Sequence, residues 1–159
     1  MKKPVGTLLL ALAVSLACAG ARAQGKPNFS GTWKQNNAKS SVRHGPGSFS
    51  YTNVIVQKGA LLQVTSIFSG SRGKSQFTDT YSIGGKPEIR KDRDGDQIST
   101  SVRLNGPALE FRSVEQESAH EIVTNQTWTL SRDGKVLTKI YHSTGPRGTY
   151  NDKYVLEKQ

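Results

Sequence analysis

Residues 28–40 read NFSGTWKQNNAKS, and strand-forming segments follow from there to the end of the chain. Phe29, Gly31 and Trp33 alternate along this stretch, so a strand would place all three on one face. A glycine inside a strand lets the strand coil sharply or lets a neighbouring group come close. A tryptophan two residues later can lie across a barrel floor, where its indole N–H needs an acceptor. The stretch therefore predicts the first strand of a β-barrel and the plug of its closed end.

Glycines mark turns at short intervals through the rest of the chain. They are Gly59, Gly70, Gly84, Gly85, Gly95, Gly106, Gly134 and Gly145. The segments between them are rich in Val, Ile, Thr, Tyr and Phe and show no helical period. They predict about ten strands, at 28–35, 50–57, 61–69, 75–83, 87–91, 97–104, 108–116, 120–131, 135–143 and 149–157. Short connections of this kind favour an all-β fold, a single up-and-down antiparallel β-barrel of about eight to ten strands.

Two dipeptides predict tight hairpin turns between neighbouring strands. Asn105-Gly106 and Asp133-Gly134 suit two-residue turns because both residues tolerate positive φ. Pairing about Asp133-Gly134 places His142 opposite Asn125 and away from His120. With the histidines apart, we expect no metal site and no cofactor.

The first residues predict a secretory signal peptide. Lys2 and Lys3 precede an apolar run over 5–19, and Ala21-Arg22-Ala23 offers small residues at a cleavage site. We expect cleavage after Ala23, a barrel domain over 24–159, and a periplasmic or secreted location. A membrane anchor is disfavoured because the run is short for a spanning helix.

Cys18 and the charge leave two alternatives open. Ser15-Leu16-Ala17-Cys18 partly matches the lipobox of acylated lipoproteins, but cleavage after Ala23 would discard the cysteine.

The same cleavage would remove three basic residues and no acid, so the formal charge of +10 becomes 10 − 3 = +7. Such a surplus could favour an anionic partner such as an envelope surface. The basic residues alternate with acids, as in 88–94, which favours a solvated, solubilising surface instead. We expect no nucleic-acid binding, because no stripe of alternating aromatic and basic residues is present.

Both ends of the predicted barrel resemble a known family. Gly31-Thr32-Trp33 resembles the G-x-W signature of lipocalins and the wider calycin superfamily, and SGTWKQNNAKS resembles the opening of small secreted lipocalin-like proteins of bacteria. Asp133-Gly134-Lys135 and the final LEKQ resemble the last hairpin and terminal strand of those proteins.

The resemblance implies a barrel that often holds a small hydrophobic molecule. Two features depart from the fatty-acid-binding relatives. The connection 36–48 is too short for their helical lid, and Tyr154 and Leu156 occupy the places of their carboxylate-binding Arg-x-Tyr pair.

These patterns predict a non-enzymatic, monomeric protein that holds a small hydrophobic or amphipathic ligand inside the barrel. The candidate ligand-binding residues are Trp33, Phe77, Tyr81, Phe111, Gln126, Trp128, Ile140 and Tyr154. Trp33 and Phe111 suit core filling, whereas the polar ends of Tyr81, Gln126 and Tyr154 suit ligand orientation. Asp79 and Asp152 are candidate inward carboxylates, and we expect no catalytic residue. The alternative function is a filled barrel that docks on anionic envelope components through its basic exterior.

Overall fold

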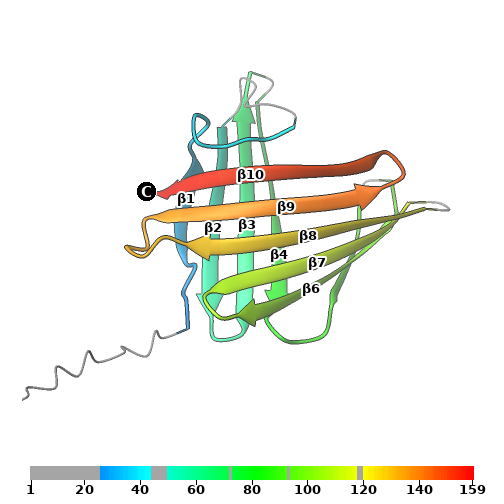
Figure 1. The fold of residues 1–159 in the computed structure, drawn as a ribbon, viewed down its shortest axis with the longest axis horizontal. Coiled ribbons are helices and arrows are strands. Elements are labelled where there is room, and N and C mark those ends of the chain that lie inside the picture. The colour runs from blue at the N-terminus through cyan, green and yellow to red at the C-terminus, as the bar shows by residue number, and fades with distance from the viewer. Residues whose placement is uncertain (1–25, 44–49, 72, 93, 118–119) are drawn as a thin grey trace, which may run out of the picture.

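The computed structural model describes residues 26–43, 50–71, 73–92, 94–117 and 120–159, and the predicted leader and Cys18 lie outside them. Ten strands form one antiparallel sheet (Figure 1). They are β1 Gly31–Gln35, β2 Ser50–Lys58, β3 Leu61–Gly70, β4 Gly73–Ser82, β5 Glu88–Lys91, β6 Gln97–Asn105, β7 Ala108–Glu117, β8 His120–Leu130, β9 Val136–Gly145 and β10 Gly148–Lys158. Among the described residues, no helix is long and apolar enough to span a membrane.

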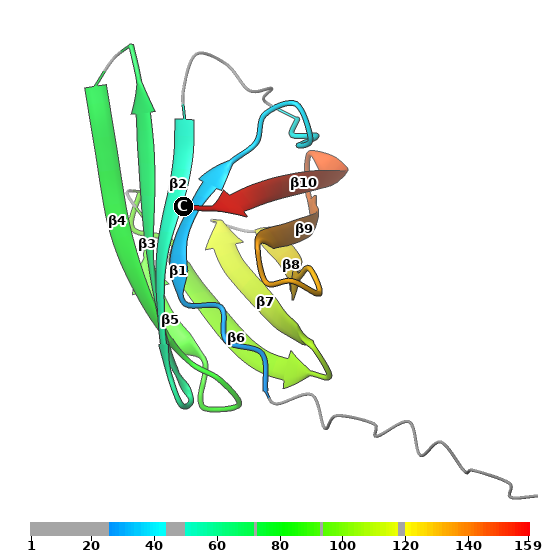
Figure 2. The same ribbon diagram turned by 90° about the vertical axis from the view of Figure 1, so that its left-hand side faces the viewer.

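The sheet is an up-and-down meander that curls into a nearly closed barrel. Its order is β4-β3-β2-β1-β10-β9-β8-β7-β6-β5, so the chain's first and last strands pair with each other. Figures 1 and 2 show β2–β4 crossing β6–β10 at a steep angle, with β1 and β10 at one of the corners. The predicted up-and-down barrel is confirmed, and the sheet has two edges, at β4 and β5.

One end of the barrel is plugged as the opening stretch predicts. Phe29 and Trp33 are both fully buried, and the Trp33 indole N–H donates to the Phe29 carbonyl oxygen at 2.9 Å. Gly31 has a φ of +146°, and a Cβ there would lie 2.9 Å from Cε of Lys158. The close approach is made by the flexible Lys158 side chain of β10, whose amine lies 5.3 Å from the Trp33 ring centroid, so the positive φ is the feature that favours glycine here.

The register predicted about Asp133-Gly134 is confirmed, whereas the turn predicted at Asn105-Gly106 lies one residue further along, because Asn105 still belongs to β6 and pairs with Ala108. His142 pairs with Asn125 across β8 and β9, as pairing about Asp133-Gly134 requires. Gly106 and Gly134 have φ of 55° and 69°, the left-handed conformation that glycine adopts most easily.

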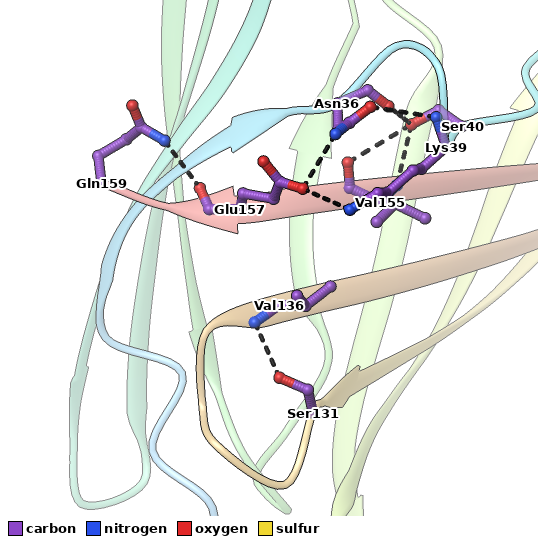
Figure 3. A network of polar contacts seen from close by, with 8 residues as sticks. All are labelled: Asn36, Lys39, Ser40, Ser131, Val136, Val155, Glu157 and Gln159. Carbon is purple, nitrogen blue, oxygen red and sulfur yellow. Dashed lines mark hydrogen bonds and ion pairs between the residues drawn. The ribbon is translucent and has the colours of Figure 1, made fainter.

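A polar network ties the segment after β1 to the end of β10. Glu157 accepts hydrogen bonds from the Asn36 amide and the Lys39 amine, each at 2.9 Å (Figure 3). The Ser40 hydroxyl donates to the Asn36 carbonyl at 2.8 Å and accepts from the Val155 backbone N–H at 3.0 Å. In the part of 36–48 that the structure describes, the chain thus forms a turn on the barrel wall.

Candidate functional site

The barrel interior holds a cavity of about 220 Å³. Its wall combines aromatic rings with polar side chains from β2 to β10. The lining residues are Tyr51, Val64, Ser66, Phe68, Phe77, Asp79, Tyr81, Arg90, Thr100, Phe111, Ser113, Gln126, Trp128, Lys139, Tyr141 and Tyr154. Such a wall suits a molecule that has both an apolar and a polar part.

Lys139 is the most unusual residue of this wall. It pairs with Trp128 on β8 and with Tyr154 on β10, so the alternation of β9 points its side chain into the barrel. It is 1% exposed, and its amine donates a hydrogen bond to the Asn53 side-chain oxygen. The amine also lies 3.5 Å from the Trp128 ring centroid, a cation–π geometry.

The environment of Lys139 disfavours the charged form of its amine. Among the described residues, none of the ion pairs within 4.0 Å involves this amine. Burial holds the pKa of Lys139 well below its ordinary value, because an ammonium group loses its hydration there. Burial therefore shifts this interior amine toward its neutral form.

Asn53 and Ser66 support Lys139 from the opposite side of the barrel. The Asn53 amide donates to the Ser66 hydroxyl at 2.9 Å, and both side chains are buried. With its Nδ2 donating to Ser66, the Asn53 amide group presents its oxygen to Lys139, so the orientation of this acceptor is fixed.

Tyrosine rings line the cavity beside Lys139. Tyr51 and Tyr141 both contact the Tyr154 ring, with centroids at 5.6 and 5.2 Å. Burial raises the pKa of Tyr154 to about 12 and that of Tyr141 well above its ordinary value. These phenols therefore stay neutral at physiological pH and act as hydrogen-bonding groups.

The cavity reaches the gap between the sheet edges. Asp79 of β4 and Arg90 of β5 approach within 3.7 Å across this gap. Phe77 lies on the inward-facing side of β4 yet is 50% exposed, because no paired strand covers it. The wall thus passes from exposed residues at the gap to buried ones at Lys139.

Six of the eight predicted ligand-binding residues line this cavity. They are Phe77, Tyr81, Phe111, Gln126, Trp128 and Tyr154. Trp33 belongs to the buried plug and does not line the cavity. Asp79 is an inward carboxylate as expected, whereas Asp152 accepts a hydrogen bond from the Arg43 backbone N–H at 2.6 Å and is not part of the cavity wall.

The inward placement of Ile140 is wrong. Its neighbour Lys139 faces the cavity, and Ile140 points outward with 49% of its surface exposed. Hydrophobicity suggested the isoleucine as the inward residue, but strand alternation allows only one of two adjacent residues to face inside.

Sequence reasoning missed Lys139, although a signal for it was present. The hairpin register that places His142 opposite Asn125 also places Lys139 opposite Trp128. Because Trp128 was expected to face inside, its directly paired neighbour had to share that face. Tyr51, Asn53 and Ser66 had no comparable signal. They lie on β2 and β3, and the register about Asp133-Gly134 does not say which side of those strands faces the interior.

Among the residues that the structure describes, no group of three or more His, Cys, Asp or Glu side chains could hold a metal ion. His142 instead hydrogen-bonds Asn151 at 2.7 Å on the exposed side of β9 and β10.

Solved structures with the same fold include a secretory heat soluble protein, a lipid binding protein and a bile acid-binding protein. Secretory abundant heat soluble protein 4 from Ramazzottius varieornatus has a TM-score of 0.63 at 16% identity, covering 85% of this chain and 96% of that one. Lipid binding protein 8 from Caenorhabditis elegans has a TM-score of 0.55 at 18% identity, covering 82% and 95%. Zebrafish ileal bile acid-binding protein, solved with cholic acid, has a TM-score of 0.52 at 17% identity, covering 82% and 98%.

The chain has the calycin-type barrel fold. The predicted resemblance to calycins is confirmed at the level of the fold. No protein-family model and no curated protein sequence matches this chain. At these identities the likeness describes the barrel and not what the barrel contains.

Proposed function

We propose that this calycin-type barrel is a non-catalytic, monomeric binding protein for a small amphipathic molecule. The observation that carries the proposal is the interior cavity, whose wall joins aromatic rings to the buried amine of Lys139. A barrel filled by its own side chains would leave no such space.

The size of the cavity narrows the ligand class. Its volume of about 220 Å³ is below the roughly 300–1,000 Å³ typical of pockets for drug-sized molecules. A compact ligand fits, with its apolar part against rings such as Phe77 and Phe111 and its polar part near Lys139 and Tyr154. The names of two structural neighbours, a lipid binding protein and a bile acid-binding protein, support an amphipathic ligand.

Export is part of the proposal. The predicted signal peptide over 1–23 would deliver the barrel to the periplasm or the exterior. Intact-mass analysis of protein expressed with its leader tests this step. A chain that starts at Gln24 supports it, and a lipid-bearing chain that starts at Cys18 would instead make the protein a lipoprotein.

The binding proposal is tested by native mass spectrometry on protein purified without detergent, followed by calorimetric titration with 1-hexanol as a model amphiphile. We expect a bound mass or a measurable affinity, and about a tenfold loss of affinity in Tyr154→Ala, which corresponds to about 1.4 kcal/mol. Tyr150→Ala is the matched control, because Tyr150 lies on the same strand and outside the cavity wall.

A bare chain that binds no amphiphile would contradict the proposal. Salt-sensitive retention on anionic vesicles would then favour the alternative function, a filled barrel that docks on envelope components.

A further inference from the structure

The position of Lys139 allows its amine to react with a bound ligand as well as to contact it. We propose that the Lys139 amine forms a reversible imine with a small aldehyde bound in the cavity. This inference rests on the proposed function, because the aldehyde must first enter the barrel.

The geometry isolates one amine inside a binding cavity. Lys139 is 1% exposed and lines the cavity, while its amine lies 3.5 Å from the Trp128 ring centroid and 5.9 Å from that of Tyr51. The Asn53 side-chain oxygen accepts one of its hydrogens. A buried amine without a carboxylate within ion-pair distance is shifted toward its neutral form, and a neutral amine has the lone pair that attacks carbonyl groups.

The reaction balances without an oxidant or a reductant. The nitrogen lone pair of Lys139 attacks the carbonyl carbon, a C–N bond forms, and the carbonyl oxygen takes up a proton to give a carbinolamine. Loss of that oxygen as water then forms the C=N bond, so the net change is amine plus aldehyde to imine plus water. When the imine is protonated, its positive charge lies over the face of Trp128, where the ring quadrupole stabilises a cation.

The remainder of the wall suits the aldehyde's carbon chain. Phe111 packs against Trp128 with ring centroids 4.4 Å apart and contacts Tyr81 at 5.5 Å. Within the part of the chain that the structure describes, Asp79 is the carboxylate that lines the cavity, and it lies at the gap beside Arg90. An apolar chain can therefore extend from Lys139 along the rings toward the gap.

The experiment uses three six-carbon compounds that differ only in the polar end: hexanal, 1-hexanol and hexanoate. Folded wild-type protein is incubated with hexanal and sodium cyanoborohydride, which reduces an imine to a stable secondary amine, and peptide mass spectrometry locates the hexyl groups. We expect Lys139 to carry at least about tenfold more adduct than the exposed lysines, because the neutral fraction of an amine rises about tenfold for each pH unit by which its pKa falls.

Matched variants assign the signal to this amine. Lys139→Met should lose the enriched adduct while its near-ultraviolet circular dichroism stays that of a folded protein. Lys153→Met, which removes an exposed lysine of β10, should keep the adduct at Lys139. The wild-type peptide map decides the proposal even where Lys139→Met folds poorly.

Titration of the wild-type protein with the other two compounds separates the two proposals. If 1-hexanol binds and hexanal modifies only exposed lysines, the imine proposal is overturned and the binding function stands. If hexanoate binds more tightly than 1-hexanol and no adduct forms at Lys139, the amine is a cationic partner for an anion and the imine proposal is likewise overturned. If none of the three compounds binds and no adduct forms at Lys139, the binding function itself fails.

Discussion

At the scale of single residues, Lys139 determines the electrostatics of the interior. Moving an ammonium ion out of water costs several kcal/mol, and one amide acceptor and an aromatic face offset only part of that cost. Burial shifts the amine toward its neutral form, whose hydrogen bond to Asn53 still satisfies a donor. The residue is therefore tolerable in the free barrel and reactive toward a suitable ligand.

This burial makes stability depend on pH. The unfolded chain keeps a proton on the Lys139 amine up to about pH 10.4, whereas the folded chain releases it at a lower pH. Between these values the unfolded state binds more protons, so the free energy of unfolding rises with pH. We expect a slope of up to about 1.4 kcal/mol per pH unit in the wild-type protein, and its loss in Lys139→Met.

Urea unfolding from about pH 7 to about pH 8.5 measures this slope. In this range the phenols of Tyr51, Tyr81, Tyr141 and Tyr154 stay neutral in the unfolded chain, and burial raises their pKa in the folded one, so they do not contribute to the slope. Lys153→Met, at an exposed site, should behave like the wild type. Parallel curves for wild type and Lys139→Met would contradict the burial argument.

At the scale of elements, β1 is the strand that joins the two halves of the sheet. It pairs with β2 on one side and with β10 on the other. Gly31 allows this, because its backbone lies at a φ that L side chains rarely adopt and Lys158 of β10 passes directly over it. The junction of the sheet therefore depends on a residue without a side chain.

Gly31→Ala should destabilise the protein by about 1–3 kcal/mol, the cost of holding a non-glycine residue in such a conformation. Chemical denaturation of Gly31→Ala in the wild-type and Lys158→Ala backgrounds separates the two causes. Because the contacted Lys158 atom is near the end of a flexible side chain, we expect most of the loss to persist in the Lys158→Ala background. Complete rescue there would assign the loss to steric overlap alone.

At the scale of the whole molecule, the barrel closes everywhere except between β4 and β5. One end of this gap is held where the Gly84 backbone N–H donates to the Val102 carbonyl at 2.7 Å. Further along, the Asp79–Arg90 pair is the ion pair that crosses the gap among the described residues. The cavity wall includes both members of this pair, so the gap is the expected route for ligand exchange.

Arg90→Ala should speed both association and dissociation of 1-hexanol by up to about fivefold, the factor that corresponds to about 1 kcal/mol for an exposed ion pair. High salt should raise the wild-type rates in the same way, because it screens such pairs. Arg103→Ala is the control, since the Arg103–Glu110 pair lies on an exposed hairpin outside the cavity wall. Exchange rates from NMR line shapes make the measurement, and a change in dissociation alone would show that Arg90 binds the ligand directly.

The amino-acid sequence by itself determined the strands, their order and much of the register. Turn chemistry at Asp133-Gly134 is local, and alternation with a period of two follows from the strand backbone, so both can be read without a structure. These local rules placed Trp33 in the plug and Trp128 in the interior.

Only the tertiary structure decided which residues meet across the barrel. Asn53 and Lys139 are 86 residues apart and belong to strands that never pair, so their contact depends on the curvature that brings β2 to face β9. The choice between Lys139 and Ile140 depended on the same closure. Hydrophobicity alone argues against a lysine inside a barrel. Lys139 is accommodated there because the Asn53 amide oxygen and the Trp128 ring, from two other strands, contact its amine.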